Sequence, residues 1–182
     1  MSWRNTIRSS RPTAWTLLAA LLLAAGCARQ EAKQGAAPPD AGTLGSKAPD
    51  FELSDLSGKT VRRSDFQGKV VILDFWATWC GPCRQEVPDF VRLQAKYRQQ
   101  GLVVVGLSLD ADGAKAVRPF AEEFNVNYPM LLANADTARL YGGVLGIPTT
   151  FVLDRQGRIV KKFIGRMESK TFEEAILPLL AT

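Results

Sequence analysis

Two cysteines separated by two residues are the most reactive feature of this 182-residue sequence. Cys80 and Cys83 lie in the segment WCGPC, residues 79–83, shortly after the apolar run VVILDFW of residues 70–76. We expect that run to be a buried strand and a helix to begin just after Cys80. Free N–H groups and the positive end of the helix dipole stabilise a thiolate at such a position. The pattern predicts Cys80 as a reactive thiol and Cys83, one turn inside the helix, as its resolving partner.

Two other interpretations of the cysteine pair stay open. A Cys-x-x-Cys pair can form half of a zinc site, but four ligands are needed, the sequence has no histidine, and the remaining cysteine, Cys27, lies outside the expected domain. A purely structural disulfide is the other interpretation, although closing so short a loop gains little entropy. Gly81 and Pro82 shape the turn, and proline is tolerated in a first helical turn. We therefore expect catalytic dithiol chemistry, without a metal and without a cofactor beyond the disulfide.

The absence of histidine excludes several classes of catalytic site. Ser-His-Asp and Cys-His nucleophile pairs, histidine-ligated metals and imidazole proton shuttles all need that residue. The chain carries 23 Lys and Arg against 18 Asp and Glu, a net charge of +5. Residues 1–26 contain three arginines and no acid, so their removal leaves 20 basic against 18 acidic residues. We therefore predict no nucleic-acid partner.

The N-terminus has the pattern of an export signal. Arginines precede the apolar run of residues 14–25, which is 12 residues long, whereas a spanning helix needs about 20. The segment AAGC that ends at Cys27 resembles the lipobox of bacterial lipoproteins, which implies a signal peptide over residues 1–26 and lipidation of Cys27. An ordinary secretory signal cut nearby, for instance after Ala28, is the alternative. Either way, we expect export to a bacterial cell envelope.

Residues 27–47 are expected to be a flexible tether that keeps the domain close to the membrane. They are rich in Ala, Gly, Gln and Pro and almost lack large apolar side chains, so they cannot bury enough surface to fold. The folded domain is therefore assigned to residues 48–182.

The domain alternates strands and helices. We expect a hairpin of residues 51–53 and 60–62, strands at 70–76, 102–109 and 128–132, helices at 83–99, 112–124 and 136–141, a hairpin of 149–153 and 158–164, and a last helix. Asp112 is predicted to cap the second helix, and Ser169 or Thr171 the last one. This order predicts an α/β fold with a mixed central sheet flanked by helices.

Two segments resemble the thioredoxin superfamily. Residues 74–83 (DFWATWCGPC) are similar to its active-site segment and residues 147–150 (IPTT) to its cis-proline loop. A longer frame, from residues 48–51 (APDF) to 83–88 (CRQEVP), resembles the TlpA/ResA/CcmG group of membrane-anchored thiol–disulfide oxidoreductases. The resemblance covers about residues 46–182. It implies a thioredoxin-like fold with an N-terminal hairpin and a central strand–helix insertion.

The resemblance also assigns roles to residues. Cys80 matches the attacking cysteine, Cys83 the resolving cysteine and Pro148 the cis-proline. The expected substrate-binding residues are Trp79, Gly81, Pro82, Ile147 and Pro148. For Trp79, packing at the rim of the domain is the alternative.

Two acids match catalytic positions in different relatives. Asp74 matches the buried acid of thioredoxin, and Glu86 matches the acid that ResA-like proteins place three residues after the second cysteine. Each is expected to assist proton transfer to or from Cys83, because a carboxylate in an apolar setting has a raised pKa. A first-turn acid that complements the helix dipole is the alternative for Glu86.

The expected function is reduction of disulfides in exported proteins, in cytochrome c maturation if the chain follows other members of the group. A membrane electron donor would then re-reduce the protein. A thiol peroxidase of peroxiredoxin type is one alternative, but that class needs Thr three residues before its reactive cysteine, where this chain has Ala77. A copper-delivery module of thioredoxin fold is another, although those proteins resemble Cys-x-x-x-Cys with a distant histidine.

Overall fold

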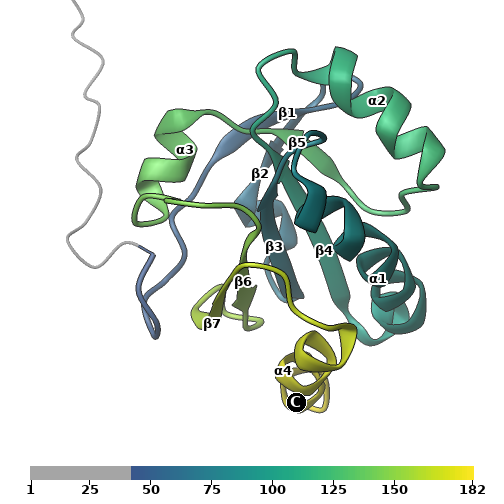
Figure 1. The fold of residues 1–182 in the computed structure, drawn as a ribbon. Helices are drawn as coiled ribbons and strands as arrows, with labels where there is room; N and C mark the ends of the chain where they lie inside the picture. The colour runs from purple at the N-terminus through teal and green to yellow at the C-terminus, as the bar shows by residue number, and fades with distance from the viewer. Residues whose placement is uncertain (1–41) are drawn as a thin grey trace, which may run out of the picture. The chain divides into compact units, whose positions relative to one another are not determined.

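A computed structural model describes residues 42–182 (Figure 1). The predicted signal peptide, Cys27 and residues 28–41 of the predicted tether lie outside this range. The strands are β1 (Glu52–Asp55), β2 (Thr60–Arg62), β3 (Val70–Trp76), β4 (Leu102–Ser108), β5 (Met130–Leu132), β6 (Thr149–Leu153) and β7 (Ile159–Ile164). The α-helices are α1 (Gly81–Tyr97), α2 (Ala114–Glu123), α3 (Ala135–Leu140) and α4 (Ser169–Leu180), and short 3-10 helices span Arg63–Phe66 and Arg98–Gln100.

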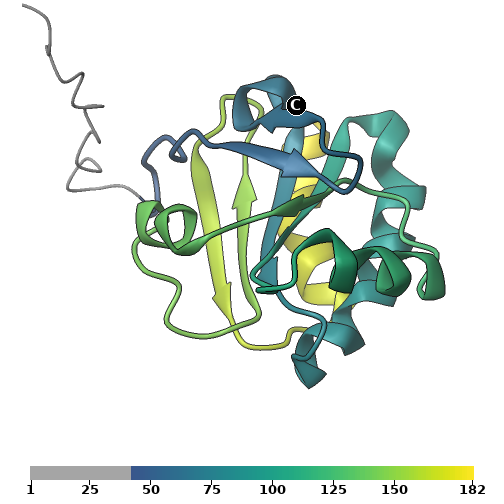
Figure 2. The same ribbon diagram turned by 90° about the horizontal axis from the view of Figure 1, so that it is seen from above.

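The described strands form one sheet in the order β2-β1-β5-β4-β3-β6-β7. Strands β3, β4 and β5 run parallel, whereas β1, β6 and β7 pair in antiparallel fashion. The predicted mixed sheet is therefore confirmed. Hairpin β1–β2 is the expected N-terminal addition, and β5 with α3 provides the strand and helix inserted before β6. Figure 2 shows the sheet from above, with α1 and α4 together on one side and α3 on the other.

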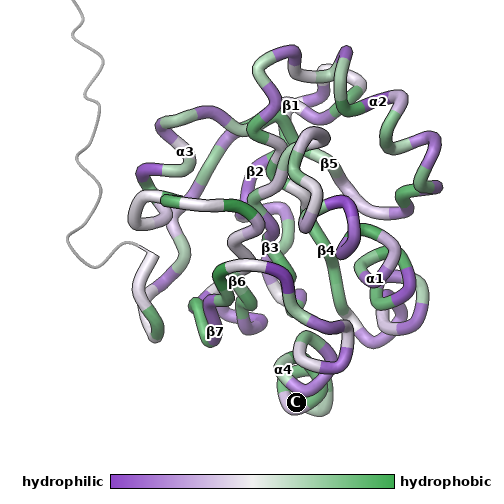
Figure 3. The backbone as a smooth tube through the Cα atoms, viewed as in Figure 1, coloured by the Kyte–Doolittle hydropathy of each residue, from purple (hydrophilic) through white to green (hydrophobic). Residues whose placement is uncertain are grey.

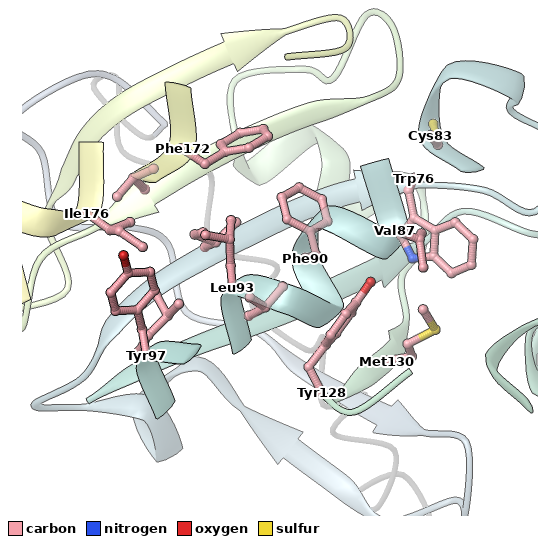
Figure 4. Close-up of a cluster of buried hydrophobic side chains, with 14 of the residues drawn as sticks. Trp76, Cys83, Val87, Phe90, Leu93, Tyr97, Tyr128, Met130, Phe172 and Ile176 are labelled. Atoms are coloured by element: carbon pink, nitrogen blue, oxygen red, sulfur yellow. The ribbon is translucent and has the colours of Figure 1, made fainter. Parts of the chain in front are cut away.

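Strand β3 is buried on both faces and therefore alternates between two cores. Val70, Ile72 and Trp76 belong to the core under α1 and α4, whereas Leu73 and Phe75 point to the opposite core. Figure 4 shows the first of these cores. In Figure 3, β4 is hydrophobic along most of its length, while α1 mixes hydrophobic and hydrophilic residues, as a helix packed on one face does.

The N-terminal edge of the described chain pairs with the β6–β7 hairpin. The N–H of Gly45 donates to the carbonyl of Ile159 (2.7 Å), and the N–H of Ala48 donates to that of Gly157 (2.8 Å). The paired backbone therefore includes residues 45–47, the last three of the segment predicted as tether.

Two predicted helix caps are wrong. The N-cap of α2 is Gly113, with φ 53° and ψ −133°, and Asp112 is exposed with no side-chain bond to the helix. Glycine occupies the cap because L side chains rarely adopt that backbone conformation. Helix α4 starts at Ser169 after Glu168, and no side chain caps it. A capping motif predicts only which residue types can cap a helix. The conformation of the loop before the helix decides which residue has the backbone angles of an N-cap.

A side chain of α1 completes the hydrogen bonding of β4. Strand β5 pairs with β4 only at Gly106–Ser108, so the N–H of Val104 lies beyond the reach of that neighbour. The buried Gln94 supplies the acceptor, with its Oε1 2.7 Å from the Val104 nitrogen. The sheet therefore depends on a helix residue where a strand is too short.

We expect Gln94→Leu to lower the free energy of unfolding by about 1–3 kcal/mol, because it leaves a buried N–H without an acceptor. Chemical denaturation measures the change. Gln99→Leu is the control, because Gln99 is exposed on the following turn. Equal stability of the two variants would contradict the role assigned to Gln94.

Candidate active site: a disulfide at a helix N-terminus

The cysteine pair lies where β3 passes into α1. Cys80 is the N-cap residue of α1, and its sulfur accepts the N–H of Cys83 at 3.3 Å. The two sulfurs form a disulfide with Cα atoms 5.3 Å apart. Pro82 lies in the first turn, where its missing N–H costs no helical hydrogen bond. After reduction, the same N–H and the helix dipole would stabilise a thiolate on Cys80.

Exposure distinguishes the two cysteines. Cys80 keeps 5% of its surface exposed and Cys83 only 1%. Both cysteines belong to the core that contains Trp76 and Val87, and Figure 4 shows Cys83 there. Cys80 is therefore the more accessible cysteine of the two.

The predicted cis-proline lies beside the cysteines. The Ile147–Pro148 peptide bond is cis, and the Ile147 carbonyl oxygen is 3.7 Å from the Cys80 sulfur. The sheet brings them together, because β6 begins directly after Pro148 and its Thr149 pairs with Phe75 near the end of β3. Residues 67 positions apart in the chain thus form one edge of the site.

Trp76 and Trp79 differ strongly in their exposure to solvent. Trp76 is 1% exposed and packs against Phe120, whereas Trp79, next to Cys80, is 70% exposed. A large apolar side chain left in solvent beside a reactive sulfur is available for contact with another protein. Gly81 is also exposed, so nothing bulky stands between Cys80 and solvent on that side.

Both predicted acids are buried. Asp74 lies in the middle of β3 and accepts a hydrogen bond from the Thr150 hydroxyl (2.9 Å). Burial raises its pKa well above the ordinary value, and the charge of Glu86 raises it further, while the Thr150 hydroxyl opposes the shift. Burial therefore favours the protonated form of Asp74.

Glu86 lies one turn after Cys83 and is fully buried. One carboxyl oxygen accepts the N–H of Met167 at 2.5 Å, and the other has no hydrogen-bond partner among the described residues. Burial raises the pKa of Glu86 to about 7, against the opposing effects of the Met167 N–H and the Arg166 charge. The first turn of α1 contains no acid, and Glu86 lies beyond it, so the alternative of a first-turn acid that complements the helix dipole is wrong.

Asp110 was missed in the sequence analysis. It directly follows Leu109, at the end of the β4 region, is 9% exposed, and its carboxylate accepts bonds from the N–H and hydroxyl of Thr78. The available signal was an acid immediately after a buried strand that neighbours β3. Only the parallel pairing of β3 with β4 brings that acid to the loop before Cys80.

Comparisons with known proteins agree with this geometry. Residues 44–162 match the model of the AhpC/TSA family. The chain is 37% identical to the thiol-disulfide oxidoreductase ResA of Geobacillus thermodenitrificans, over 72% of this chain and 75% of that protein. It is 38% identical to the thioredoxin-like protein YneN of Bacillus subtilis, over 72% and 78% of the two chains.

A solved structure of similar fold comes from Chlorobium tepidum, a protein assigned as thiol:disulfide interchange protein DsbE. It has a TM-score of 0.70 and 40% identity, covering 75% of this chain and 97% of that one. The chain belongs to the AhpC/TSA family of the thioredoxin superfamily. Together with the Cys80–Cys83 disulfide, these relatives make it a thiol–disulfide oxidoreductase. Neither the peroxidase nor the copper-delivery alternative is favoured.

The raised pKa of Glu86 predicts a pH-dependent stability of the disulfide form. Between about pH 4.5, the ordinary glutamate value, and about pH 7, the unfolded chain releases this proton while the folded chain keeps it. The free energy of unfolding should therefore fall as the pH rises through this window, by about 1–3 kcal/mol. Denaturant titrations at several pH values measure this fall.

Glu86→Gln keeps the acceptor for the Met167 N–H and removes the titrating group, so it should flatten this dependence. Glu122→Gln, at an exposed position of α2, is the matched control and should leave the dependence unchanged. An unchanged slope in Glu86→Gln would contradict the assignment.

Proposed function

We propose that this oxidoreductase reduces disulfides in exported proteins, with Cys80 as the attacking and Cys83 as the resolving cysteine. The observation that supports this proposal best is the disulfide at the N-terminus of α1, in which Cys80, the more exposed cysteine, lies beside Ile147 and Cys83 is the more deeply buried. This asymmetry fits a two-step exchange in which one sulfur meets the substrate.

The exchange transfers two electrons from the reduced Cys80–Cys83 pair to a client disulfide in two steps. The Cys80 thiolate attacks one sulfur of the client disulfide, a mixed disulfide forms, and the other client sulfur leaves as a thiolate that takes up a proton. The Cys83 thiol loses its proton, and its sulfur attacks Cys80, which releases the second client sulfur. Two electrons pass to the client, and the Cys80–Cys83 disulfide remains.

We assign proton transfer at Cys83 to the two buried acids. Glu86 is one helical turn from Cys83, and its pKa of about 7 lets it accept a proton near neutrality. Asp74 shares the same core face of β3 as Ile72 and Trp76 and is coupled electrostatically to Glu86. Solvent cannot easily reach Cys83, so an internal acceptor replaces water.

We assign client binding to Trp79, Gly81, Pro82, Ile147 and Pro148. The exposed indole of Trp79 offers an apolar contact. In the described part of the chain, the N–H of Ile147 has no acceptor, so it is free to bond to the main chain of an extended client segment. The client cysteine would then lie next to Cys80.

The N-terminal sequence favours an extracytoplasmic location with a membrane anchor. The N-terminal signal pattern and the lipobox-like segment at Cys27 support it, and a Corynebacterium glutamicum relative of solved structure is described as secreted. No helix within residues 42–182 is long and apolar enough to span a bilayer. Anchoring would keep the domain near a membrane electron donor that re-reduces it. No metal, other cofactor or nucleic acid is part of this proposal.

Cys80→Ser should abolish catalysed reduction of insulin, because it removes the nucleophile. Cys83→Ser should instead accumulate a mixed disulfide through Cys80, since nothing resolves it. Non-reducing gels and peptide mass spectrometry identify the bonded cysteine. Trapped partners attached through Cys83 would reverse the assignment.

The direction of electron flow is tested by the reduction potential. Gly81 and Pro82 are also the intervening pair of thioredoxin, whose potential is about −270 mV, and the nearby acids disfavour a thiolate when ionised. We expect a value below about −200 mV in a glutathione titration. A value near −120 mV, with a Cys80 pKa near 4, would identify an oxidant instead.

A further inference from the structure

The loop that carries Cys80 is tied to the end of β4 by a single carboxylate. The Thr78 N–H donates to Asp110 Oδ2 at 3.0 Å, and the Thr78 hydroxyl donates to Oδ1 at 2.5 Å. The Ser108 hydroxyl donates to Oδ2 at 2.7 Å, which fixes the carboxylate from its own strand. Asp110 thus accepts bonds from three donors, two of them on Thr78 and one on Ser108.

The rest of the loop is fixed around this contact. The Leu109 N–H donates to the Trp76 carbonyl (2.9 Å), directly before the loop, and the Cys80 N–H donates to the Ala77 carbonyl (3.1 Å). The Thr78 carbonyl accepts a bond from the Arg84 guanidinium at 3.3 Å. The N–H, the carbonyl and the hydroxyl of Thr78, two residues before Cys80, therefore all form hydrogen bonds.

The carboxylate also places a negative charge beside this loop. The titratable or charged groups around the cysteines include Asp74 of β3, whose burial favours the protonated form, Arg84, Glu86 and Asp89 of α1, Glu123 of α2 beside Arg84, and Arg166 after β7, with Asp110 added after β4. A negative charge near Cys80 disfavours its thiolate and so favours the disulfide form of the pair.

We propose that Asp110 is a positioning residue for Cys80: through Thr78 it fixes the loop that holds the sulfur at the N-terminus of α1, and its charge biases the pair toward the disulfide. This inference rests on the nucleophilic role proposed for Cys80. Its test nevertheless needs no client, so a failure here is distinguishable from a failure of the reductase assignment.

The test compares Asp110→Asn with Asp112→Asn, which removes the same charge from an exposed position in the same loop and touches no residue of the site. In the reduced protein, the rate of Cys80 labelling by iodoacetamide is followed against pH, with Cys80 resolved by peptide mass spectrometry. Asp110→Asn keeps an oxygen at the Oδ1 position, which accepts both the N–H and the hydroxyl of Thr78, and it removes the charge. It should therefore lower the pH midpoint by about 0.5 unit, which is about a threefold faster labelling below the midpoint. Asp112→Asn should leave it unchanged.

A purely structural role would lower the thermal midpoint and leave the pH midpoint in place. If Asp110→Asn folds and its Cys80 has the same pH midpoint as in Asp112→Asn, the proposal is overturned. If Asp110→Asn does not fold, the Thr78 variants decide. Thr78→Val removes only the hydroxyl bond and should slow Cys80 labelling at least about threefold at pH 8, whereas Thr78→Ser keeps the bond and should restore the rate. Equal rates in the two Thr78 variants overturn the proposal.

Discussion

The position of one sulfur atom at a helix N-terminus is the constraint on which the rest of the structure depends. Cys80 caps α1, and its sulfur accepts the N–H of Cys83, so the group that reacts is also the group that satisfies a free helix donor. That geometry requires a strand that ends close by, a short loop and a helix that begins at once. Strand β3, which is buried along its whole length and lies between β4 and β6, supplies that strand.

The electrostatics of the site follow from the same placement. Because α1 packs its first turns onto the β3 face that carries Asp74, both Asp74 and Glu86 are enclosed with the inner cysteine. Their raised pKa values follow mainly from burial; the charge of Glu86 raises the pKa of Asp74 further, and that of Asp89 raises the pKa of Glu86. Arg166 and the Met167 N–H limit the effect at Glu86.

The insertion and the N-terminal hairpin extend the sheet without disturbing this centre. Strands β1, β2 and β5 are added on the far side of β4, and the hairpin β6–β7 lies on the other side of β3. Since β5 is short, Gln94 of α1 completes the hydrogen bonding of β4. The helix that carries the cysteines thus bonds directly to β4 at a residue that β5 does not reach.

The sequence alone predicted the dithiol pair and the strand and helix that flank it, because these signals are local: a spacing and an apolar run. Asp74, Glu86 and Pro148 were assigned through the resemblance of their segments to thioredoxin-like proteins. The caps of α2 and α4 escaped sequence reasoning because loop geometry, not residue type, selects the cap. The approach of Ile147 to Cys80, the separate environments of Trp76 and Trp79, and the contact of Asp110 with Thr78 were decided only by tertiary structure. Each of these joins segments far apart in the chain or depends on which face a side chain takes, and strand pairing across the sheet sets both.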